Sequence, residues 1–259
     1  MMTLFCAIWS SFLVLASSSP IEKEITRADD LRYLIGYSEP YSTGVSYTFT
    51  EYVPDLSVVM MDDIIDSVCG TGLWILYDSI NYDSNHEVCV YEGVNGCGTW
   101  DTFCWNVGSS LRYAGSPSGI NNDYYNLYKG TTLRGEEFRG ATDAADLGIF
   151  DLTISSLVVT GQSAWTFYEG LNFSGSAVCV YADQHISNNG TDLDFIHVLA
   201  LSEIGLPNNS IRSVKRGCHA ERVVGAPLNG TRGGGKTSMT SATEEMDAMS
   251  ITRVHTVHV

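Results

Sequence analysis

The strongest constraint on the fold is an internal duplication. Residues 74–82 read WILYDSINY and residues 165–173 read WTFYEGLNF, so that aromatic, apolar and polar positions coincide one by one. Residues 88–91 and 178–181 both read VCVY, and they are separated by nearly the same offset of about ninety residues. Two long-range matches at nearly one offset predict two similar domains of about ninety residues each.

The repeated stretch is typical of a β-hairpin. Residues 165–175 alternate apolar and polar side chains, turn at Glu169-Gly170 and resume with Phe173. A finer copy, YNLYKGTTLRG, occupies residues 125–135, and a degenerate copy, YSEPYSTG, occupies residues 37–44. From Leu31 to Cys218 the chain is rich in aromatic and β-branched residues and is broken by Gly, Asn, Asp and Ser, which predicts an all-β fold.

Each hairpin is followed further along by a serine in an apolar strand. The backbone donors at a folded hairpin tip are out of reach of neighbouring strands, and a short hydroxyl from a crossing strand can satisfy one of them. Pairs of such units can bury their alternating faces as a two-sheet β-sandwich. The serines are Ser67, Ser110, Ser156 and Ser213.

The fourfold order of hairpin, strand, loop, serine and strand resembles the Greek key motif of the βγ-crystallins, in a secreted, invertebrate-type member. The resemblance implies an aromatic residue, a hairpin glycine and a tying serine in each motif. These roles fall to Trp165, Gly170 and Ser213 in the fourth motif and to Tyr125, Gly130 and Ser156 in the third. In the second motif, with Trp74 and Ser110, Ser79 stands at the glycine position, which predicts a relaxed or strained tip; the first motif offers Ser67.

The chain divides into four predicted segments. Residues 1–18 begin with an uncharged apolar run and end in small residues, which predicts a cleaved secretory signal. βγ-crystallin-like domains are expected at residues 31–115 and 124–218, separated by the polar linker 116–123. Residues 219–259 are rich in Gly, Thr, Ser and Met and are predicted to be a disordered tail.

The cysteines suit an oxidising compartment. Cys6 leaves with the signal, and an even number of cysteines remains. Our preferred pairing joins Cys179 to Cys218, Cys97 to Cys104 and Cys69 to Cys89. The rival pairing joins Cys89 to Cys104 and Cys69 to Cys97.

Sequons and net charge add to the prediction of a secreted protein. The sequons predict glycosylation at Asn172, Asn189, Asn208 and Asn229. The formal net charge of −16 disfavours nucleic acid and anionic lipid as partners. After residue 18 the sequence contains no second apolar run of membrane-spanning length.

Calcium is the cofactor that the resemblance implies. Related proteins bind it through six-residue loops of the form Asn/Asp-Asn/Asp-x-x-Ser/Thr-Ser, with two loops sharing each site. Imperfect versions occupy residues 62–67, 105–110, 151–156 and 208–213, called loops 1 to 4 below. Arg212 at the fifth position of loop 4 supplies no oxygen and argues against one site. The candidate ligands are Asp62, Asp63, Asp66, Ser109, Asp151, Ser155, Asn208 and Asn209.

No constellation in the sequence favours catalysis. The histidines are scattered, no serine or cysteine stands in a nucleophile elbow, and His255-x-x-His258 is a lone pair of metal-binding side chains in the tail. We therefore expect a non-enzymatic extracellular protein with a structural or interaction role, and no cofactor other than calcium. Its extracellular partner is not indicated by the sequence, and its domains can pair within one chain or between two chains as a homodimer. The alternative is a secreted defence or toxin-like factor, antimicrobial or protease-inhibiting.

Overall fold

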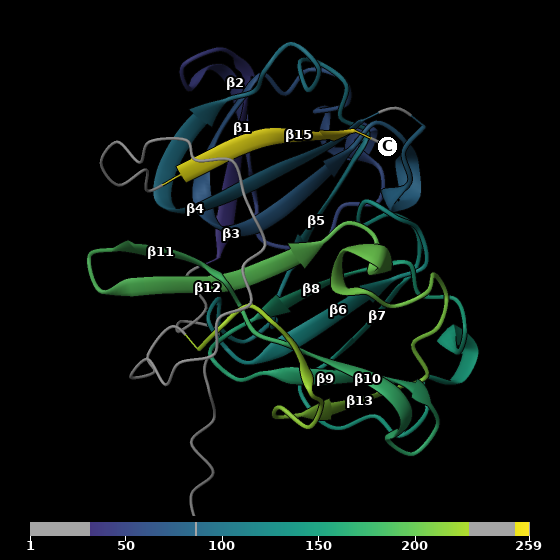
Figure 1. The fold of residues 1–259 in the computed structure, drawn as a ribbon. Coiled ribbons are helices and arrows are strands. Elements are labelled where there is room, and N and C mark those ends of the chain that lie inside the picture. The colour runs from purple at the N-terminus through teal and green to yellow at the C-terminus, as the bar shows by residue number, and fades with distance from the viewer. Residues whose placement is uncertain (1–31, 86, 228–251, 259) are drawn as a thin grey trace, which may run out of the picture.

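The computed structural model describes residues 32–85, 87–227 and 252–258 (Figure 1). Within these ranges the strands form three sheets, which the ribbon shows as two stacked halves. The predicted signal at residues 1–18 and the sequon asparagine Asn229 lie outside the described residues. Inside them, no helix is long and apolar enough to cross a membrane.

The first half is built on one bent sheet, in the order β15-β4-β3-β1-β2 with β5 also paired to β3. The bend lies in β3, where the register with β4 shifts between Gly70 and Gly72. Gly72 has φ +112°, and a Cβ at Gly70 would lie 2.3 Å from the Tyr33 carbonyl oxygen, so the bend needs both glycines. The strands of this half are β1 (Tyr33–Glu39), β2 (Thr43–Phe49), β3 (Ser67–Tyr77), β4 (Glu87–Thr99) and β5 (Ser110–Ala114).

The second half is a two-sheet sandwich. One sheet has the order β11-β12-β8-β6-β7 and the other the order β13-β9-β10-β14. Trp165 and Phe167 of β9 face Tyr125 and Leu127 of β6 across the sandwich core. The strands are β6 (Tyr124–Tyr128), β7 (Glu137–Gly140), β8 (Ser156–Thr160), β9 (Trp165–Gly170), β10 (Ser174–Val180), β11 (Gln184–Asn188), β12 (Thr191–Val198), β13 (Ser213–Arg216) and β14 (Arg222–Val224).

Helical structure in the described ranges is limited to short 3-10 turns. They are η2 (Leu56–Val59), η3 (Ile80–Tyr82), η4 (Gly148–Phe150) and η5 (Leu201–Ile204). The prediction of an all-β fold is therefore confirmed.

The two halves share a buried interface within one chain. Leu73, Ile75 and Val90 of the first half pack with Val158 and Phe195 of the second in one hydrophobic cluster. A buried arginine crosses this interface: Arg112 of β5 donates to the carbonyl oxygens of Leu133 (2.7 Å) and Gly135 (2.9 Å). Pairing of the halves thus uses apolar burial and a satisfied buried cation together.

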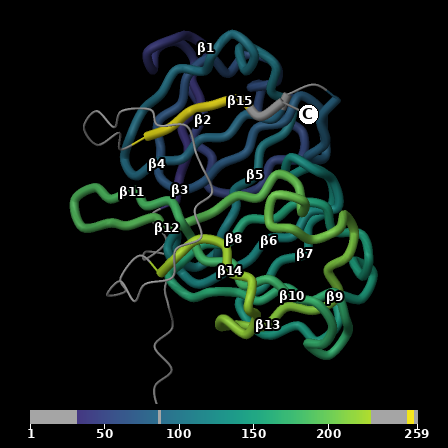
Figure 2. Tube along the Cα trace, in the orientation of Figure 1, coloured from purple at the N-terminus to yellow at the C-terminus, as the bar shows by residue number. Residues whose placement is uncertain are grey.

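Two segments of the region expected to be disordered are strands. β14 pairs in parallel with β10, and β15 (Thr252–His258) pairs antiparallel with β4, placing Val254 opposite Tyr91 (Figure 2). The expectation of disorder is wrong for these segments because β10 and β4 each offer an edge that a short β-prone run can pair with. Residues 228–251 of the predicted tail lie outside the described residues.

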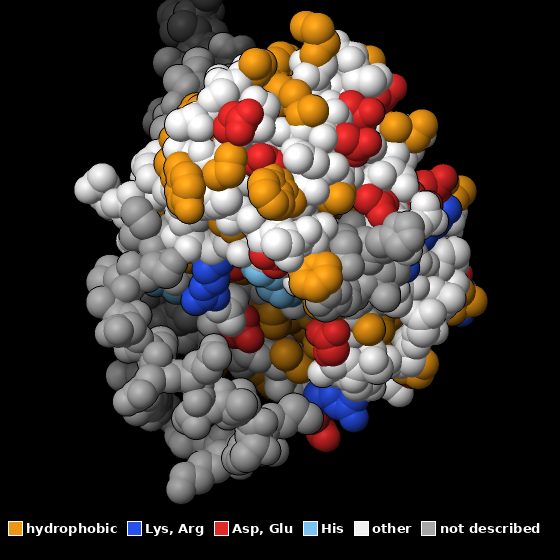
Figure 3. All heavy atoms as spheres, turned by 90° about the horizontal axis from the view of Figure 1, so that it is seen from above, with side chains coloured by type: hydrophobic (Ala, Val, Ile, Leu, Met, Phe, Trp, Pro, Cys, Tyr) orange, Lys and Arg blue, Asp and Glu red, His pale blue; other side chains and the backbone are white. Residues whose placement is uncertain are grey.

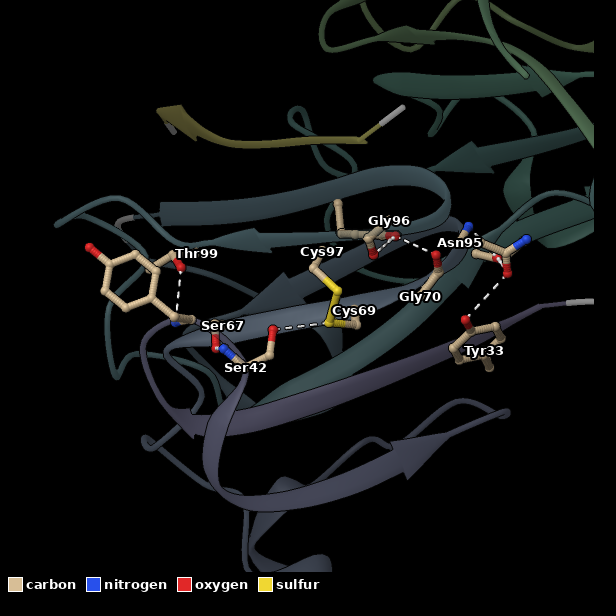
Figure 4. Close-up of a disulfide and its surroundings, with 12 residues drawn as sticks. Tyr33, Ser42, Ser67, Cys69, Gly70, Asn95, Gly96, Cys97 and Thr99 are labelled. Carbon is tan, nitrogen blue, oxygen red and sulfur yellow. Dashed lines mark hydrogen bonds between the residues drawn. A yellow bond between two sulfur atoms is a disulfide. The ribbon is translucent and has the colours of Figure 1, made fainter. Parts of the chain in front are cut away.

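The disulfides correct part of the expected pairing. Cys179–Cys218 is present as predicted, but the other bonds are Cys69–Cys97 and Cys89–Cys104, the rival pairing. Antiparallel β3 and β4 place Cys69 opposite Cys97 with their Cα atoms 4.0 Å apart (Figure 4). The predicted bonds Cys97–Cys104 and Cys69–Cys89 are wrong because strand register, and not proximity in the sequence, decides the partners.

Candidate functional site

Four folded hairpin tips organise the loops around the candidate site. Each predicted hairpin has two successive residues in the left-handed region, with φ between 53° and 63°. These pairs are Tyr41-Ser42, Asn81-Tyr82, Thr132-Leu133 and Asn172-Phe173. Because the chain turns so sharply there, the N–H of the second residue cannot join the neighbouring strands and needs another acceptor.

The predicted serines supply that acceptor in every motif. Each hydroxyl accepts one hairpin N–H at 2.9–3.0 Å and donates to a hairpin carbonyl at 2.6 Å. Figure 4 shows the first of these ties, between Ser67 and Ser42 beside the Cys69–Cys97 disulfide. The tying serines are Ser67, Ser110, Ser156 and Ser213.

Loops 1 to 4 have a common backbone geometry. The second residue of each loop is left-handed: Asp63 (φ 52°), Asn106 (55°), Leu152 (56°) and Asn209 (59°). The N–H of each fifth residue donates to a tyrosine carbonyl of the hairpin that the same loop's serine ties. Asn and Asp adopt the left-handed region more readily than other side chains, which explains their presence at three of these positions.

In the first half, loops 1 and 2 bring oxygen ligands together. The Asp63 carboxylate accepts a hydrogen bond from Ser109, and the Asp63 N–H donates to the Gly108 carbonyl at 2.9 Å. Desolvation raises the pKa of Asp63, and the carboxylates of Asp62 and Asp78 raise it further. Carboxylates crowded so closely favour a bound cation.

Asp66 of loop 1 is a second argument for a cation in this half. Its side chain is only 4% exposed, and among the described residues its Oδ1 atom has no hydrogen-bond partner. A buried carboxylate oxygen that lacks a donor is costly unless a positive charge compensates it. Asp66 and Ser109 are the fifth residues of loops 1 and 2, and Asp63 and Asn106 are their second residues. Asp66 and Asn106 therefore correspond, by the approximate symmetry of the two loops, to Ser109 and Asp63.

The second half offers one comparable contact and one in which an arginine takes the place of an oxygen ligand. Ser155 of loop 3 donates to Asn209 of loop 4 at 3.1 Å, which repeats the Ser109–Asp63 contact without a carboxylate. At the symmetric position Arg212 binds Asp151 with two hydrogen bonds of 2.9 and 2.6 Å. The hydrogen bond from Arg212 lowers the pKa of Asp151. The Arg212 guanidinium is therefore a fixed positive charge at the fifth loop position, where Ser109 and Ser155 present oxygen atoms.

The structure separates the sequence-based candidates into groups. Asp63 and Ser109 meet, Asp66 is buried nearby, and Ser155 meets Asn209, whereas Asp151 is paired with Arg212. Asp62 is exposed beside Asp63, and Asn208 is exposed at the start of loop 4.

Sequence reasoning missed Asp78, which lies just before the hairpin position of Ser79 and influences Asp63. Aligning the four hairpins would have indicated it, since Glu169 stands at the equivalent place before Gly170. Sequence reasoning also missed that the hairpin tip with Ser79 has the same geometry as the others. The Ser110 hydroxyl accepts from the Tyr82 N–H at 3.0 Å and donates to the Ser79 carbonyl at 2.6 Å, and Ser79 itself is extended, with φ −131°. The expected relaxed or strained tip is therefore not found.

Comparison with solved structures identifies the fold. No protein-family model matches the chain, and no curated protein matches it. The chain is similar to geodin, a βγ-crystallin from Geodia cydonium, at 18% identity and a TM-score of 0.52, over 72% of this chain and 99% of geodin. A βγ-crystallin from an archaeon matches 37% of this chain and 99% of its own length at 26% identity and a TM-score of 0.29. A βγ-crystallin from Ciona intestinalis matches 36% of this chain and 98% of its own length at 20% identity and a TM-score of 0.28.

Proposed function

On the βγ-crystallin fold that this chain adopts, we propose a secreted, non-enzymatic protein that binds calcium through loops 1 and 2. One observation carries the proposal: Asp63 and Ser109 converge from the two loops while the buried Asp66 carboxylate has an oxygen without a hydrogen-bond donor. Asp63 and Ser109 would hold one ion, and Asp66 and Asn106, at the symmetric position, would hold a second. Calcium would supply a cross-link between the loops, in addition to the serine ties.

The surface and the disulfides support an extracellular structural or interaction role. The described residues contain three disulfides, and the sequon asparagines among them, Asn172, Asn189 and Asn208, are all exposed. Figure 3 shows hydrophobic groups scattered among acidic ones on the face of the first half seen from above. The exposed hydrophobic residues of that half include Tyr41, Val45, Val58, Met60, Phe103 and Trp105. We propose domain boundaries at residues 31–115 and 124–218, with residues 252–258 added to the first domain.

Calcium should raise the melting temperature of the protein, and Asp66→Asn should weaken calcium binding at least about tenfold, or about 1.4 kcal/mol in binding free energy. The reason is that Asn keeps the shape of the side chain but removes the negative charge. Isothermal titration calorimetry with CaCl2 measures the affinity, and Glu221→Gln, an exposed carboxylate outside the loops, is the control. No binding heat at millimolar calcium, or equal losses in both variants, would refute the proposal.

The same titration should depend on pH in a defined direction. Calcium needs the Asp63 carboxylate, and the raised pKa of this group keeps it protonated to a higher pH than an ordinary aspartate with a pKa of about 3.9. As the pH falls, calcium binding should therefore weaken at a higher pH than the one at which an ordinary aspartate becomes protonated.

Replacing the internal cation of the second half should create a further calcium site. The double variant Leu152→Asn and Arg212→Ser places an amide and a hydroxyl opposite each other, as Asp63 and Ser109 are in the first half, and releases Asp151 as an additional ligand. Asn also suits the left-handed backbone at position 152 better than Leu. We expect the calorimetric stoichiometry to rise by about one ion per chain.

The matched control for this gain is Leu152→Asn with Arg216→Ser, which removes an exposed arginine outside the loops. An unchanged stoichiometry in the test variant would show that Arg212 is not what keeps calcium out of this loop pair.

A further inference from the structure

A cluster of metal-binding side chains lies away from the calcium loops, where three distant parts of the chain meet. Glu92 comes from β4, His197 from β12 and His255 from β15. One nitrogen or oxygen atom of each lies within 4.8 Å of the other two. The Glu92 Oε1 and His197 Nδ1 atoms are 3.2 Å apart, and the centroids of the His197 and His255 rings are 5.8 Å apart.

Glu92 is the unusual member of the cluster. It is 1% exposed, and its Oε1 atom, like Nδ1 of His197, makes no hydrogen bond of acceptable geometry with any described residue. The short distance between these two atoms is thus a charge contact and not a formed hydrogen bond. A carboxylate buried in this way needs a positive partner directed at its oxygen.

The electrostatic surroundings favour a cation. Besides Glu92, the carboxylates of Asp183 and Glu203 line the same pocket as His197. His255 is partly buried beside Glu92 and His197. Arg253 and Asp101 are the other charged groups that act on His255. Negative groups therefore outnumber positive ones around the two rings.

We propose that Glu92, His197 and His255 form a binding site for a divalent transition metal ion, and that Zn2+ is the ion this donor set fits best. Two imidazoles and one carboxylate are ligands that zinc takes in tetrahedral geometry, at about 2.0–2.2 Å, which places ligand atoms about 3.3 Å apart. The Glu92–His197 distance already matches this spacing, and the His255 atom, which lies within 4.8 Å of the other two, has to approach them by at most about 1.5 Å. Calcium prefers all-oxygen sites, so this site is chemically distinct from loops 1 and 2.

The site has an entry path and a structural consequence. The His197 ring lines a surface pocket of about 240 Å3 together with Asp183 and Glu203, so solvent reaches the cluster. Figure 3 shows histidine side chains at the surface beside charged groups. Because His255 belongs to the last strand, a bound ion would join β15 to both β4 and β12 and so fasten the C-terminal strand to both halves.

The test is titration of the full mature chain with ZnCl2 by calorimetry, with Co2+ as a spectroscopic probe. We expect about one Zn2+ per chain and the intense visible absorption of four-coordinate Co2+. Glu92→Gln and His255→Ala should each weaken zinc binding at least about tenfold. His219→Ala, which changes a histidine that contacts the Arg216 carbonyl and is not part of the cluster, should leave zinc affinity unchanged.

Two further measurements keep the proposal falsifiable. His255→Ala changes an edge strand and not the core, so its circular dichroism should stay native even if Glu92→Gln fails to fold. Zinc should slow amide exchange in residues 252–258 of the wild type and not of His255→Ala. Absence of zinc binding at micromolar concentration, weak octahedral Co2+ spectra, or an equal loss in His219→Ala would each overturn the assignment.

Discussion

Replacing Arg112 with methionine is expected to lower the free energy of unfolding by about 3–5 kcal/mol. The arginine is 1% exposed and is held by the Tyr77 hydroxyl at 2.8 Å and by the carbonyl oxygens of Leu133 and Gly135. Methionine fills similar space but leaves the Gly135 carbonyl and the Tyr77 hydroxyl oxygen without this donor, while the Leu133 carbonyl keeps the hydrogen bond from Tyr77. Urea denaturation at neutral pH measures the loss.

The same replacement should also uncouple the two halves. Arg112 lies over the rings of Tyr77 and Tyr128, which come from opposite sides of the interface. We expect a broader transition or a second unfolding step, because the interface loses the arginine that bridges Tyr77 and Tyr128, although hydrogen bonds such as Tyr77–Leu133 and Arg134–Ser84 remain. Arg216→Met is the control, since its partner Asp123 lies at 3.3 Å in a half-exposed pair. A similar loss in both variants would show that Arg112 has no special role in pairing.

Trp165→Ala is expected to cost about 3–5 kcal/mol of folding free energy. Trp165 is fully buried at the centre of the second half, and its ring meets the Tyr125 ring edge-on at a centroid distance of 4.7 Å. Removing the indole leaves a cavity between the two sheets that neighbouring side chains cannot fill without moving both. Thermal and chemical denaturation measure the change.

Trp105→Ala provides the matched control, because that indole is 49% exposed in loop 2. Its replacement should change the unfolding free energy by no more than about 0.5 kcal/mol. A small loss for Trp165→Ala would mean that the sandwich core is far more adaptable than its packing indicates.

The repeated part of the fold could be predicted because its physical requirements are local. Trp165, Gly170 and Ser213 all belong to the same hairpin motif. The serine hydroxyl has to accept from one unpaired N–H and donate to one carbonyl at the hairpin tip. The glycine is needed because Ser174 approaches its backbone closely: a Cβ at Gly170 would lie 2.6 Å from the Ser174 carbonyl oxygen. Such requirements leave a signature at fixed spacing, which a single sequence displays.

Other features depend on which segments meet, and no local pattern records that. The partner of Cys69 is set by the register of β3 against β4, so a shift of that register would have changed it. Arg212 looked like the simple loss of one oxygen ligand from loop 4, yet the structure shows that it neutralises Asp151 of the neighbouring loop 3. Glu92, His197 and His255 become a cluster only once β15 is placed on β4.

The position of β15 has a consequence for the order in which the protein is made. Thr252 pairs with Gly93, so the first half emerges from the ribosome long before the strand that covers the edge of β4. Until residues 252–258 are synthesised, that edge presents unpaired backbone groups next to the forming Cys89–Cys104 bond. A nascent chain of this protein therefore has to keep an open sheet edge away from its neighbours until β15 has been made, and chains that stop before residue 252 would expose that edge permanently.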